Sequence, residues 1–413
     1  MSFSFGFSGD DIEDDGGETQ IAETLSREMS KHNISNINLE KSHVIEPKRH
    51  ALEDLLSSLP SQISYNTLTI PTPTPTPTSS STLPTPLSNF QDTASTTTIQ
   101  SNHTQVLRRS LFDIRAQLMA EADPSTNDDA AETMLAGLES GDLTSGIYEG
   151  GFKTWECALD LACLVATRHY LDMMSNITQD WEVIELGAGS AVPSLALLRT
   201  FLGSTNTQKP DQQSPQSTNA QAPRLKFTLC DYNEEVLRLC TAPNVLLNYH
   251  YYGIGSKQSV PDGPPSPPAL ASEEGELDME EMGATFLPDL VQDIKSRNVS
   301  FDFISGGWGD SFLDLIPVSK PDADRPTNLL ILASETIYSP ASSKIFADTL
   351  LRLLRRHDRG SAKAWVAAKK VYFGVGGGVD EFVRDIENQG GRSRVLLETK
   401  DTGVGRVVLE ITT

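Results

Sequence analysis

Residues 181–193, WEVIELGAGSAVP, decide the fold of this chain, because they describe a buried strand that breaks into a glycine turn. Gly187 and Gly189 allow positive φ angles and let the backbone approach a ligand closely. The apolar stretch Leu195–Leu198 that follows suits a helix packed on a parallel sheet. This strand, turn and helix predict a nucleotide-binding site.

The residues around the turn indicate which nucleotide it binds. A dinucleotide-binding turn needs a third small residue at position 192, where this chain has Val192 followed by Pro193. The carboxylate of Glu185, two residues before the first glycine, would also repel a phosphate. Both features favour a ligand that has no phosphates and carries a positive charge. S-adenosylmethionine is such a ligand.

A second strand, in LKFTLCDYN (225–233), ends in Asp231. An acidic residue at this position accepts hydrogen bonds from both ribose hydroxyls of a nucleotide. The alternative is that Asp231 only caps a helix running from Glu234 to about Asn248. Together the two strand ends favour an adenosine site, to which we also assign the next two residues, Tyr232 and Asn233.

The remaining pattern predicts a doubly wound α/β fold. Strands at 182–186, 225–230, 301–305, 329–334 and 364–369 alternate with helices, and a pair at 394–399 and 405–411 follows. Five parallel strands and a closing hairpin are typical of the seven-strand, Rossmann-like methyltransferase sheet, with helices on both faces. Ligands of such sheets bind at the carboxyl ends of the strands. The residues at those ends are Glu185–Gly189, Asp231, Gly306, Gly307, Trp308 and Ser334.

The first 105 residues differ in composition from the rest. They are rich in Ser, Thr, Asp and Glu and contain TIPTPTPTPTSSS (69–81), so we expect a mostly disordered tail. Within it, the leucines of 48–65 follow helical spacing, which predicts a short amphipathic docking element or a transient helix. A second helix is predicted over 104–122, near the start of one folded domain at 106–413. Two segments without periodicity, 203–223 and 253–283, are predicted to be disordered surface insertions.

Composition limits the partners. A formal net charge of −23, with no cluster of five or more Lys and Arg, argues against general nucleic-acid binding and suits a basic protein partner. The four cysteines form no Cys-x-x-Cys pair and indicate reduced, buried thiols, and the seven histidines show no metal-ligand clustering. There is no signal-peptide pattern and no apolar run of about 18 residues that would span a membrane. We expect a monomeric protein of the cytoplasm and nucleus, without a metal.

Seven segments of the chain occur in the order and spacing of one family. They are YEGGFKTWEC (148–157), ELGAGSAVP (185–193), DYNEEVL (231–237), APNVLLN (242–248), SGGW (305–308), SETIY (334–338) and KKVYFGVGGGV (369–379). Over residues 146–413 the chain resembles the eukaryotic protein-histidine N-methyltransferases, a branch of the seven-strand S-adenosylmethionine-dependent enzymes. It differs at Ala188 and Ala191, where relatives often have Cys and Gly. The resemblance implies methylation of a histidine in a large-subunit ribosomal protein, with a role in ribosome biogenesis or translation.

The resemblance also implies which residues hold the cofactor. The stretch that lines its methionine end in the family matches Thr154, Trp155, Glu156, Cys157 and Ala158. Glu156, a carboxylate at the start of an apolar helix, needs a partner, and the ammonium group of the cofactor would serve. Trp308 follows two glycines and is placed to cover the adenine, unless it is a core tryptophan.

The acceptor side is predicted at SETIY. Neutral imidazole is already nucleophilic near pH 7, because its unperturbed pKa is about 6.5, so the enzyme must mainly orient the ring and stabilise its new charge. Glu335 would accept a hydrogen bond from the other ring N–H, and Tyr338 would form a wall of the pocket. The alternative is that both residues cap a helix beginning near Pro340. The glycines at 374–378 predict either a flexible loop over the acceptor peptide or a wide turn.

Two other functions remain open at this point. Lysine-modifying relatives share the acidic-x-x-aromatic motif, so the chain would also suit a protein-lysine methyltransferase. A non-catalytic module for basic clients would retain the fold without the chemistry. The intact Gly187, Gly189, Asp231 and 334–338 argue against that last function.

Overall fold

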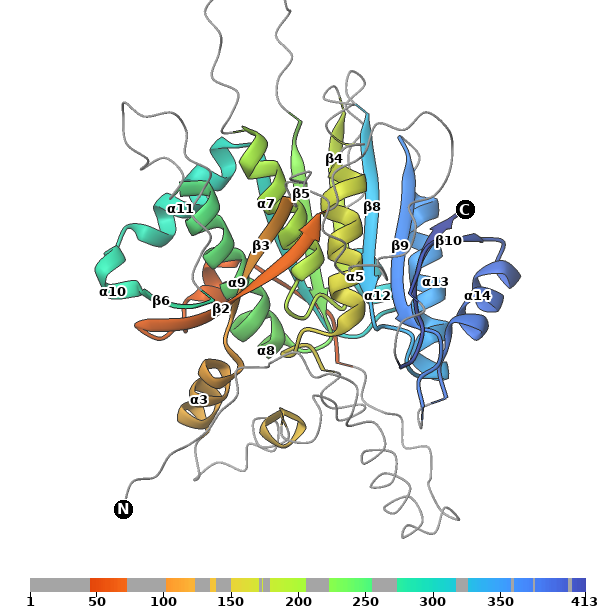
Figure 1. Cartoon of the computed structure of the whole chain (residues 1–413), viewed down its shortest axis with the longest axis horizontal. Coiled ribbons are helices and arrows are strands. Elements are labelled where there is room, and N and C mark those ends of the chain that lie inside the picture. The colour runs from red at the N-terminus through yellow and green to blue at the C-terminus, as the bar shows by residue number, and fades with distance from the viewer. Residues whose placement is uncertain are drawn as a thin grey trace, which may run out of the picture.

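The fold is centred on an eight-stranded mixed sheet (Figure 1). The computed structural model describes residues 45–72, 102–122, 134–138, 150–170, 173, 179–205, 223–254, 273–316, 326–357, 360–373, 376–399 and 403–413. The strands, in their order across the sheet, are β1 (Lys48–His50), β7 (Val299–Ser305), β5 (Leu225–Asp231), β4 (Asp180–Leu186), β8 (Thr327–Ser334), β9 (Ala362–Lys369), β11 (Arg406–Thr412) and β10 (Arg392–Thr399).

The sheet confirms the predicted topology. Strands β7, β5, β4, β8 and β9 are parallel, and β11 pairs antiparallel with both β9 and β10. Without β1, and numbered along the chain from β4, the order across the sheet is 3-2-1-4-5-7-6. The chain crosses over on either side of β4, so this strand lies at the switch point where α/β sheets bind ligands.

Helices cover both faces of the sheet (Figure 1). Strand β8 shows the division, since Leu330 and Leu332 pack into the core on one face while Leu329 and Ile331 pack into the core on the other. The first face carries α5 (Glu156–Leu164), α7 (Val192–Thr205), α9 (Ala242–Tyr249) and α11 (Phe286–Ser296). The second face carries α12 (Asp310–Leu315), α13 (Pro340–Arg356) and α14 (Val379–Asn388). No helix in the described ranges is long and apolar enough to cross a membrane.

A second, three-stranded sheet packs on α7 and α9. Its strands are β3 (Asn102–Arg109), β2 (Gln62–Thr72) and β6 (Glu274–Asp278), with β2 in the centre. All pairings are antiparallel, and they place Leu68 opposite Val106 and Ile63 opposite Leu277. This accessory sheet therefore joins segments that lie about 30 and 200 residues apart in the chain.

The predicted domain boundary at residue 105 is wrong. Strand β1 joins the main sheet beside β7, and α2 (Leu52–Leu56) buries three leucines against the same core as α9. The predicted amphipathic helix at 48–65 thus covers only five residues, and β2 begins at Gln62. Composition averaged over the first 105 residues hid this segment, because the polar stretches around it dominate the average. The predicted tail residues 1–44 and 73–101 lie outside the described part of the chain.

The helix predicted over 104–122 is also corrected, because its first half is strand β3. Helix α3 (Leu111–Glu121) follows Ser110, whose side chain accepts a hydrogen bond from the backbone N–H of Asp113. Two asparagines of α9 bind the backbone of β3. Asn248 accepts from Leu107 N at 2.9 Å and donates to Leu107 O at 2.6 Å, and Asn244 accepts from Arg109 N at 2.6 Å. The APNVLLN motif therefore holds the accessory sheet on the methyltransferase core.

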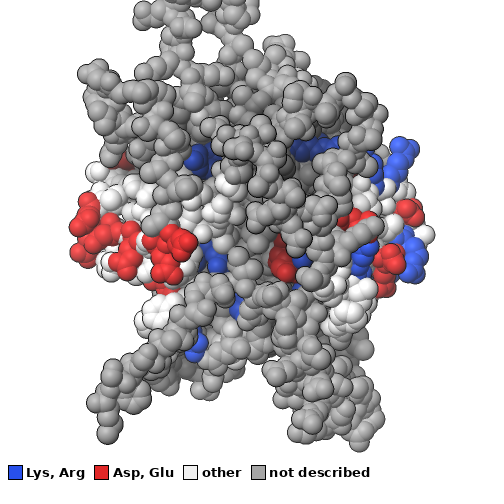
Figure 2. Space-filling model, in the orientation of Figure 1, with Lys and Arg blue, Asp and Glu red and all other residues white. Residues whose placement is uncertain are grey.

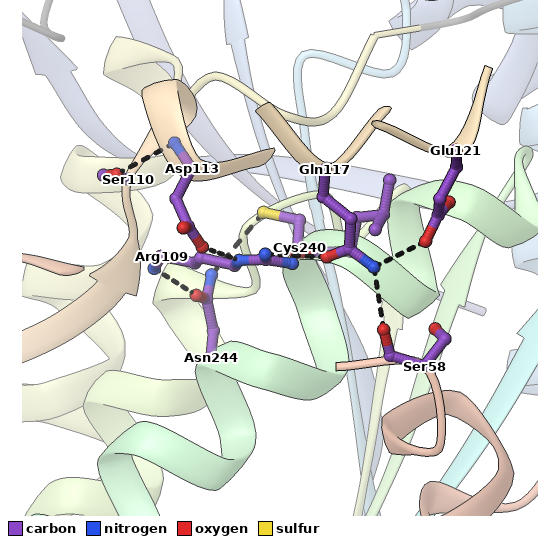
Figure 3. Close-up of polar contacts among 9 residues, drawn as sticks. Ser58, Arg109, Ser110, Asp113, Gln117, Glu121, Cys240 and Asn244 are labelled. Atoms are coloured by element: carbon purple, nitrogen blue, oxygen red, sulfur yellow. Dashed lines mark hydrogen bonds and ion pairs between the residues drawn. The ribbon is translucent and has the colours of Figure 1, made fainter. Parts of the chain in front are cut away.

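Arg109 connects α3 to this core through buried polar contacts (Figure 3). Its Nε donates to Asp113 Oδ2 at 2.5 Å and its Nη2 to Gln117 Oε1 at 2.7 Å, while Nη1 reaches the carbonyl of Leu239. Gln117 in turn donates to the carbonyl of Ser58, next to α2. The N-terminal elements and the main sheet consequently form one packed unit.

The two predicted insertions are shorter than expected. Helix α7 continues to Thr205 and a π-helical turn spans His250–Ile254, which shortens both segments at their starts. Residues 274–282 are ordered, since β6 pairs with β2 and Asp278 caps α10 (Met279–Met282) by accepting from two backbone N–H groups. Residues 206–222 and 255–272 lie outside the described ranges.

Candidate active site

The glycine turn after β4 touches two of the other predicted motifs. Gly187 and Gly189 have φ angles of 68° and 50°. A Cβ atom at Gly187 would lie 2.9 Å from Thr336 Cγ2 of the SETIY segment. One at Gly189 would lie 2.9 Å from the carbonyl oxygen of Gly151, in the YEGG segment. The turn is thus packed between these two segments, and only glycine leaves room for both contacts.

Asp231 fastens this turn to the end of β5. Its Oδ2 accepts from the backbone N–H of Gly189 at 2.8 Å, and its carbonyl accepts from Gly306 N at 3.0 Å. Asp231 is not the N-cap of the next helix, which is Asn233, and its Oδ1 lies 3.4 Å from Asn233 N. A buried carboxylate beside a glycine turn is where the ribose of an adenosine would be bound. The position of Asp231 is therefore compatible with the predicted ribose contact, which stays a prediction.

We expect Asp231→Ala to weaken binding of S-adenosylmethionine by about 1 to 3 kcal/mol, the range for leaving buried polar groups without a partner. The loss combines the ribose contacts with the bond that holds Gly189. Calorimetric titration with the cofactor measures it. An unchanged dissociation constant would mean that neither contact of Asp231 contributes to cofactor binding.

Glu185 supports the turn from beneath. The side chain is fully buried, and its Oε2 accepts from Ser194 N at 3.1 Å in the first turn of α7. Burial raises the pKa of this carboxyl to about 8, opposed by the bonds from Ser194. This geometry does not support the inference that Glu185 repels a phosphate, because the carboxyl is buried beneath the turn and bound to the start of α7. Its direct contact with a cofactor stays a prediction.

Glu185 also predicts a pH dependence of stability. Its folded pKa of about 8 lies above the unfolded value of 4.5, so between these values the folded state holds a proton that the unfolded state releases. Stability is accordingly lost as pH rises through this window. Glu185→Gln mimics the protonated form, so we expect its stability relative to the original protein to improve steadily as pH rises from 5 to 8. Urea unfolding at four pH values tests this, and a pH-independent difference would contradict it.

The segment before α5 lines the same turn. Thr154 Oγ1 lies 2.9 Å from Ser190 Oγ of the glycine turn and accepts from the buried Arg108 Nη1 at 3.1 Å. Trp155 precedes α5 and is 37% exposed, with Lys369 Nζ 5.8 Å from its ring centroid. Cys157 and Ala158 are buried in the first turn of the helix. This segment is therefore in place to border a cofactor.

Glu156 has a protein partner, which corrects its predicted need for the cofactor's ammonium group. Its Oε2 lies 3.3 Å from Arg406 Nη1 on β11. The same guanidinium donates through Nε to Asp160 Oδ2 at 2.7 Å. Two carboxylates of α5 thus hold one arginine of the closing hairpin, which fixes the start of the helix beside the site. An ammonium group would have to share Glu156 with Arg406.

The SGGW segment has a second function that the sequence did not show. A Cβ atom at Gly306 would lie 2.5 Å from Pro47 Cα, and Gly307 N donates to the carbonyl of Ile45 at 2.9 Å. These glycines therefore make room for the N-terminal segment. Trp308 is half-buried and packs on Phe346 of α13, with ring centroids 5.1 Å apart. Its predicted contact with adenine stays a prediction.

Glu335, directly after β8, has the features of a functional carboxylate. Its φ angle is 57°, a left-handed conformation that is strained for a residue other than glycine. Tyr372 donates its hydroxyl to Oε2 at 2.5 Å, while Oε1 is buried without a hydrogen-bond partner. Burial raises the pKa of Glu335, and the nearby Cys157, the hydroxyl of Tyr372 and the charge of Lys369 oppose that rise. Tyr372 thus fixes Oε2, and Oε1 is buried without a hydrogen-bond partner in the described structure.

The alternative that Glu335 and Tyr338 cap the next helix is wrong. Helix α13 is capped by Ser339, whose Oγ accepts from Ser342 N at 3.4 Å. Tyr338 is half-buried and its carbonyl accepts from Gly377 N at 3.0 Å. Its role as a wall of the acceptor pocket stays a prediction.

The described part of the glycine loop, Gly376–Gly378, is an ordered turn. Tyr372 N donates to Gly377 O at 3.1 Å, and Gly376 N donates to Tyr372 O at 3.3 Å. A Cβ atom at Gly377 would lie 2.2 Å from the carbonyl oxygen of Tyr338. For these residues the wide turn fits better than a flexible loop, and Gly374 and Val375 lie outside the described residues.

Sequence reasoning missed three polar residues that the fold brings to this region: Tyr372, Lys369 and Arg108. Tyr372 and Lys369 lie inside the KKVYFGVGGGV segment, in which only the glycines were interpreted as functional. Arg108 comes from the accessory sheet, in a stretch interpreted as helix. Among the described residues there is no group of three or more His, Cys, Asp or Glu that would hold a metal ion.

The strand order, the glycine turn and the carboxylate at the tip of β5 define a seven-strand, S-adenosylmethionine-dependent methyltransferase. No protein-family model matches the chain. Histidine protein methyltransferase 1 of Saccharomyces cerevisiae is 31% identical over 92% of this chain and 89% of its own length, and that of Schizosaccharomyces pombe is 31% identical over 74% and 76%. The chain belongs to the histidine protein methyltransferase family.

Similar solved structures include two methyltransferases. Magnesium protoporphyrin IX methyltransferase from Synechocystis with bound SAH is 11% identical, covers 73% of this chain and 94% of its own, and has a TM-score of 0.30. Glycopeptide N-methyltransferase MtfA complexed with sinefungin is 10% identical over 60% and 85%, with a TM-score of 0.25.

Proposed function

We propose that this enzyme transfers a methyl group from S-adenosylmethionine to an imidazole nitrogen of a histidine in a large-subunit ribosomal protein, and so acts in ribosome biogenesis or translation. The observation that carries the chemistry is the open Oε1 of Glu335. A buried carboxyl oxygen without a partner is costly, and an N–H group of the substrate would satisfy it. Thr336, the next residue, touches Gly187, so this oxygen belongs to the segment that borders the cofactor turn.

The residues present fit the cofactor. Gly187 and Gly189 hold the turn in a positive-φ conformation against Thr336 and Gly151, and the carboxylate of Asp231 beside it is placed for the ribose. When bound, S-adenosylmethionine supplies an electrophilic methyl group. Glu335 accepts one N–H of the acceptor imidazole, which turns the lone pair of the other nitrogen toward that methyl group. As the ring gains positive charge, the carboxyl stabilises it in a site shielded from water.

The surface supports a basic substrate. Figure 2 shows acidic side chains gathered at one edge of the molecule, over β6 and α10. The exposed residues there are Glu273, Glu274, Glu276, Glu280 and Glu281. With a net charge of −23, this enzyme would attract a basic protein such as a ribosomal protein, most strongly at low salt. The proposal implies a cytoplasmic and nuclear enzyme, where such proteins are made and assembled.

Mass spectrometry of ribosomal proteins from cells with and without the enzyme tests the substrate. We expect one histidine of a large-subunit protein to lose its methyl group when the enzyme is absent, and the purified enzyme to restore it. A methyllysine that disappears in place of methylhistidine would contradict the proposed acceptor. Unchanged ribosomal proteins, with another protein losing methylhistidine, would contradict the ribosomal part alone.

A further inference from the structure

Tyr372 makes the shortest described polar contact to Glu335. Its hydroxyl donates to Glu335 Oε2 at 2.5 Å, and Lys369 N donates to the same hydroxyl oxygen at 3.2 Å. The hydroxyl oxygen accepts from a backbone N–H while its single proton is donated to the carboxyl. The contact involves Oε2 of Glu335.

The backbone around Tyr372 is held by the glycine turn. Tyr372 exchanges hydrogen bonds with Gly376 and Gly377, and Val371 forms a β-bridge with Gly378. The same Gly377 donates to the carbonyl of Tyr338, two residues beyond the acceptor motif's Thr336. One turn thus sets the position of Tyr372 relative to the segment that contains Glu335. This explains why position 377, where a Cβ would meet Tyr338 O, is glycine.

We infer that Tyr372 is a positioning residue for methyl transfer, which holds Oε2 of Glu335 so that only Oε1 is left for the acceptor imidazole. The inference rests on the proposed role of Glu335. Without the hydroxyl, the carboxyl rotates more freely and presents either oxygen, so the attacking nitrogen is aligned with the methyl group less often. Tyr372 acts through Glu335, and the inference requires no contact between Tyr372 and the substrate.

Tyr372→Phe keeps the ring and removes the hydroxyl. We expect turnover at saturating substrate to fall about tenfold, the effect of one lost hydrogen bond to a charged group, with cofactor affinity unchanged. Burial raises the pKa of Glu335 and the Tyr372 hydroxyl opposes it, so its removal should move the acid limb of the kcat profile to higher pH. In a Glu335→Gln background, Tyr372→Phe should cause no further loss.

Tyr249→Phe is a matched control, since Tyr249 donates to Asp293 Oδ2 at 2.9 Å between α9 and α11. It should lower the melting temperature and leave the pH profile unchanged. Original turnover and profile in Tyr372→Phe would overturn the inference, as would equal slowing with and without Glu335. Full activity of Glu335→Gln alone would instead refute the proposed role of Glu335.

Discussion

A chain that begins at residue 106 is expected neither to fold cooperatively nor to bind S-adenosylmethionine, although every cofactor residue predicted from the sequence lies beyond residue 150. The deletion removes β1, α2, β2 and the first four residues of β3, 102–105. Each large apolar side chain that it takes from the core contributes about 1.5 to 3 kcal/mol, whereas a whole domain is stable by only about 5 to 15 kcal/mol. The buried apolar residues lost, among those described, are Leu52, Leu55, Leu56, Ile63, Tyr65, Leu68 and Ile70.

The deletion also exposes the surfaces that these residues cover. Strands β3 and β6 lose their shared partner β2, and β7 becomes an open edge. At the carboxyl end of β7, Ser305 loses the imidazole of His50, 2.8 Å from its hydroxyl, and Gly307 loses the carbonyl of Ile45. These lost contacts lie at the carboxyl end of β7, where Ser305 pairs with Asp231 of β5.

Circular dichroism melting and titration with S-adenosylhomocysteine measure the effect. The control is a chain that begins at residue 45, which keeps every described contact and should melt and bind as the full protein does. Residues 1–44 would then be dispensable for both properties. A cooperative melt and full cofactor affinity for the chain from residue 106 would show that β1, α2 and β2 are an appendage.

The main sheet could be predicted because its signals are local. Strand β4 is buried along its whole length and ends in glycines, and β5 and β8 are mostly buried apolar runs. Strand β3 could not, because it carries two arginines, and buried arginines are not expected in a core strand. The local signal that marks its end is Ser110, followed three residues later by Asp113, a helix N-terminus that excludes the longer helix.

Strand β2 was not predicted from the sequence for a different reason. Its buried residues alternate as Ile63 and Tyr65 and then as Leu68 and Ile70, so the period of two changes phase in the middle. Both of its partners are distant in the chain, and neither partner is a strand by its own pattern. The accessory sheet exists only through these non-local pairings, which a single sequence does not reveal.

The candidate site could likewise be predicted only in part. Residues at strand ends, such as Asp231 and Glu335, could be placed because topology carries them to one edge of the sheet. Their partners could not, because Tyr372 binds Glu335 across 37 residues and Arg406 binds Glu156 across 250. The sequence therefore predicted where these carboxylates lie in the fold better than what each of them contacts.

Glu335→Gln is expected to lower turnover a hundredfold or more, about the effect of removing one preorganised electrostatic contact in an active site. The amide keeps the shape of the side chain and one acceptor oxygen, but it cannot offset the positive charge that the imidazole gains. Cofactor affinity should stay nearly constant, because no described hydrogen bond joins the Glu335 side chain to the glycine turn or to Asp231. Single-turnover transfer to a histidine peptide or ribosomal protein, beside cofactor titration, measures both quantities.

Glu410→Gln provides the matched control for this change. Glu410 is a mostly buried glutamate of β11 that accepts from Trp365 Nε1 at 3.2 Å and pairs with Arg394, so its neutralisation costs stability without touching the acceptor side. Equal slowing by both variants would indicate a general structural effect. If Glu335→Gln alone is slow and still binds cofactor, the carboxyl acts on the acceptor. If it turns over normally, or if cofactor binding collapses in parallel, Glu335 only anchors the start of α5 through Cys157, and the acceptor histidine is bound elsewhere.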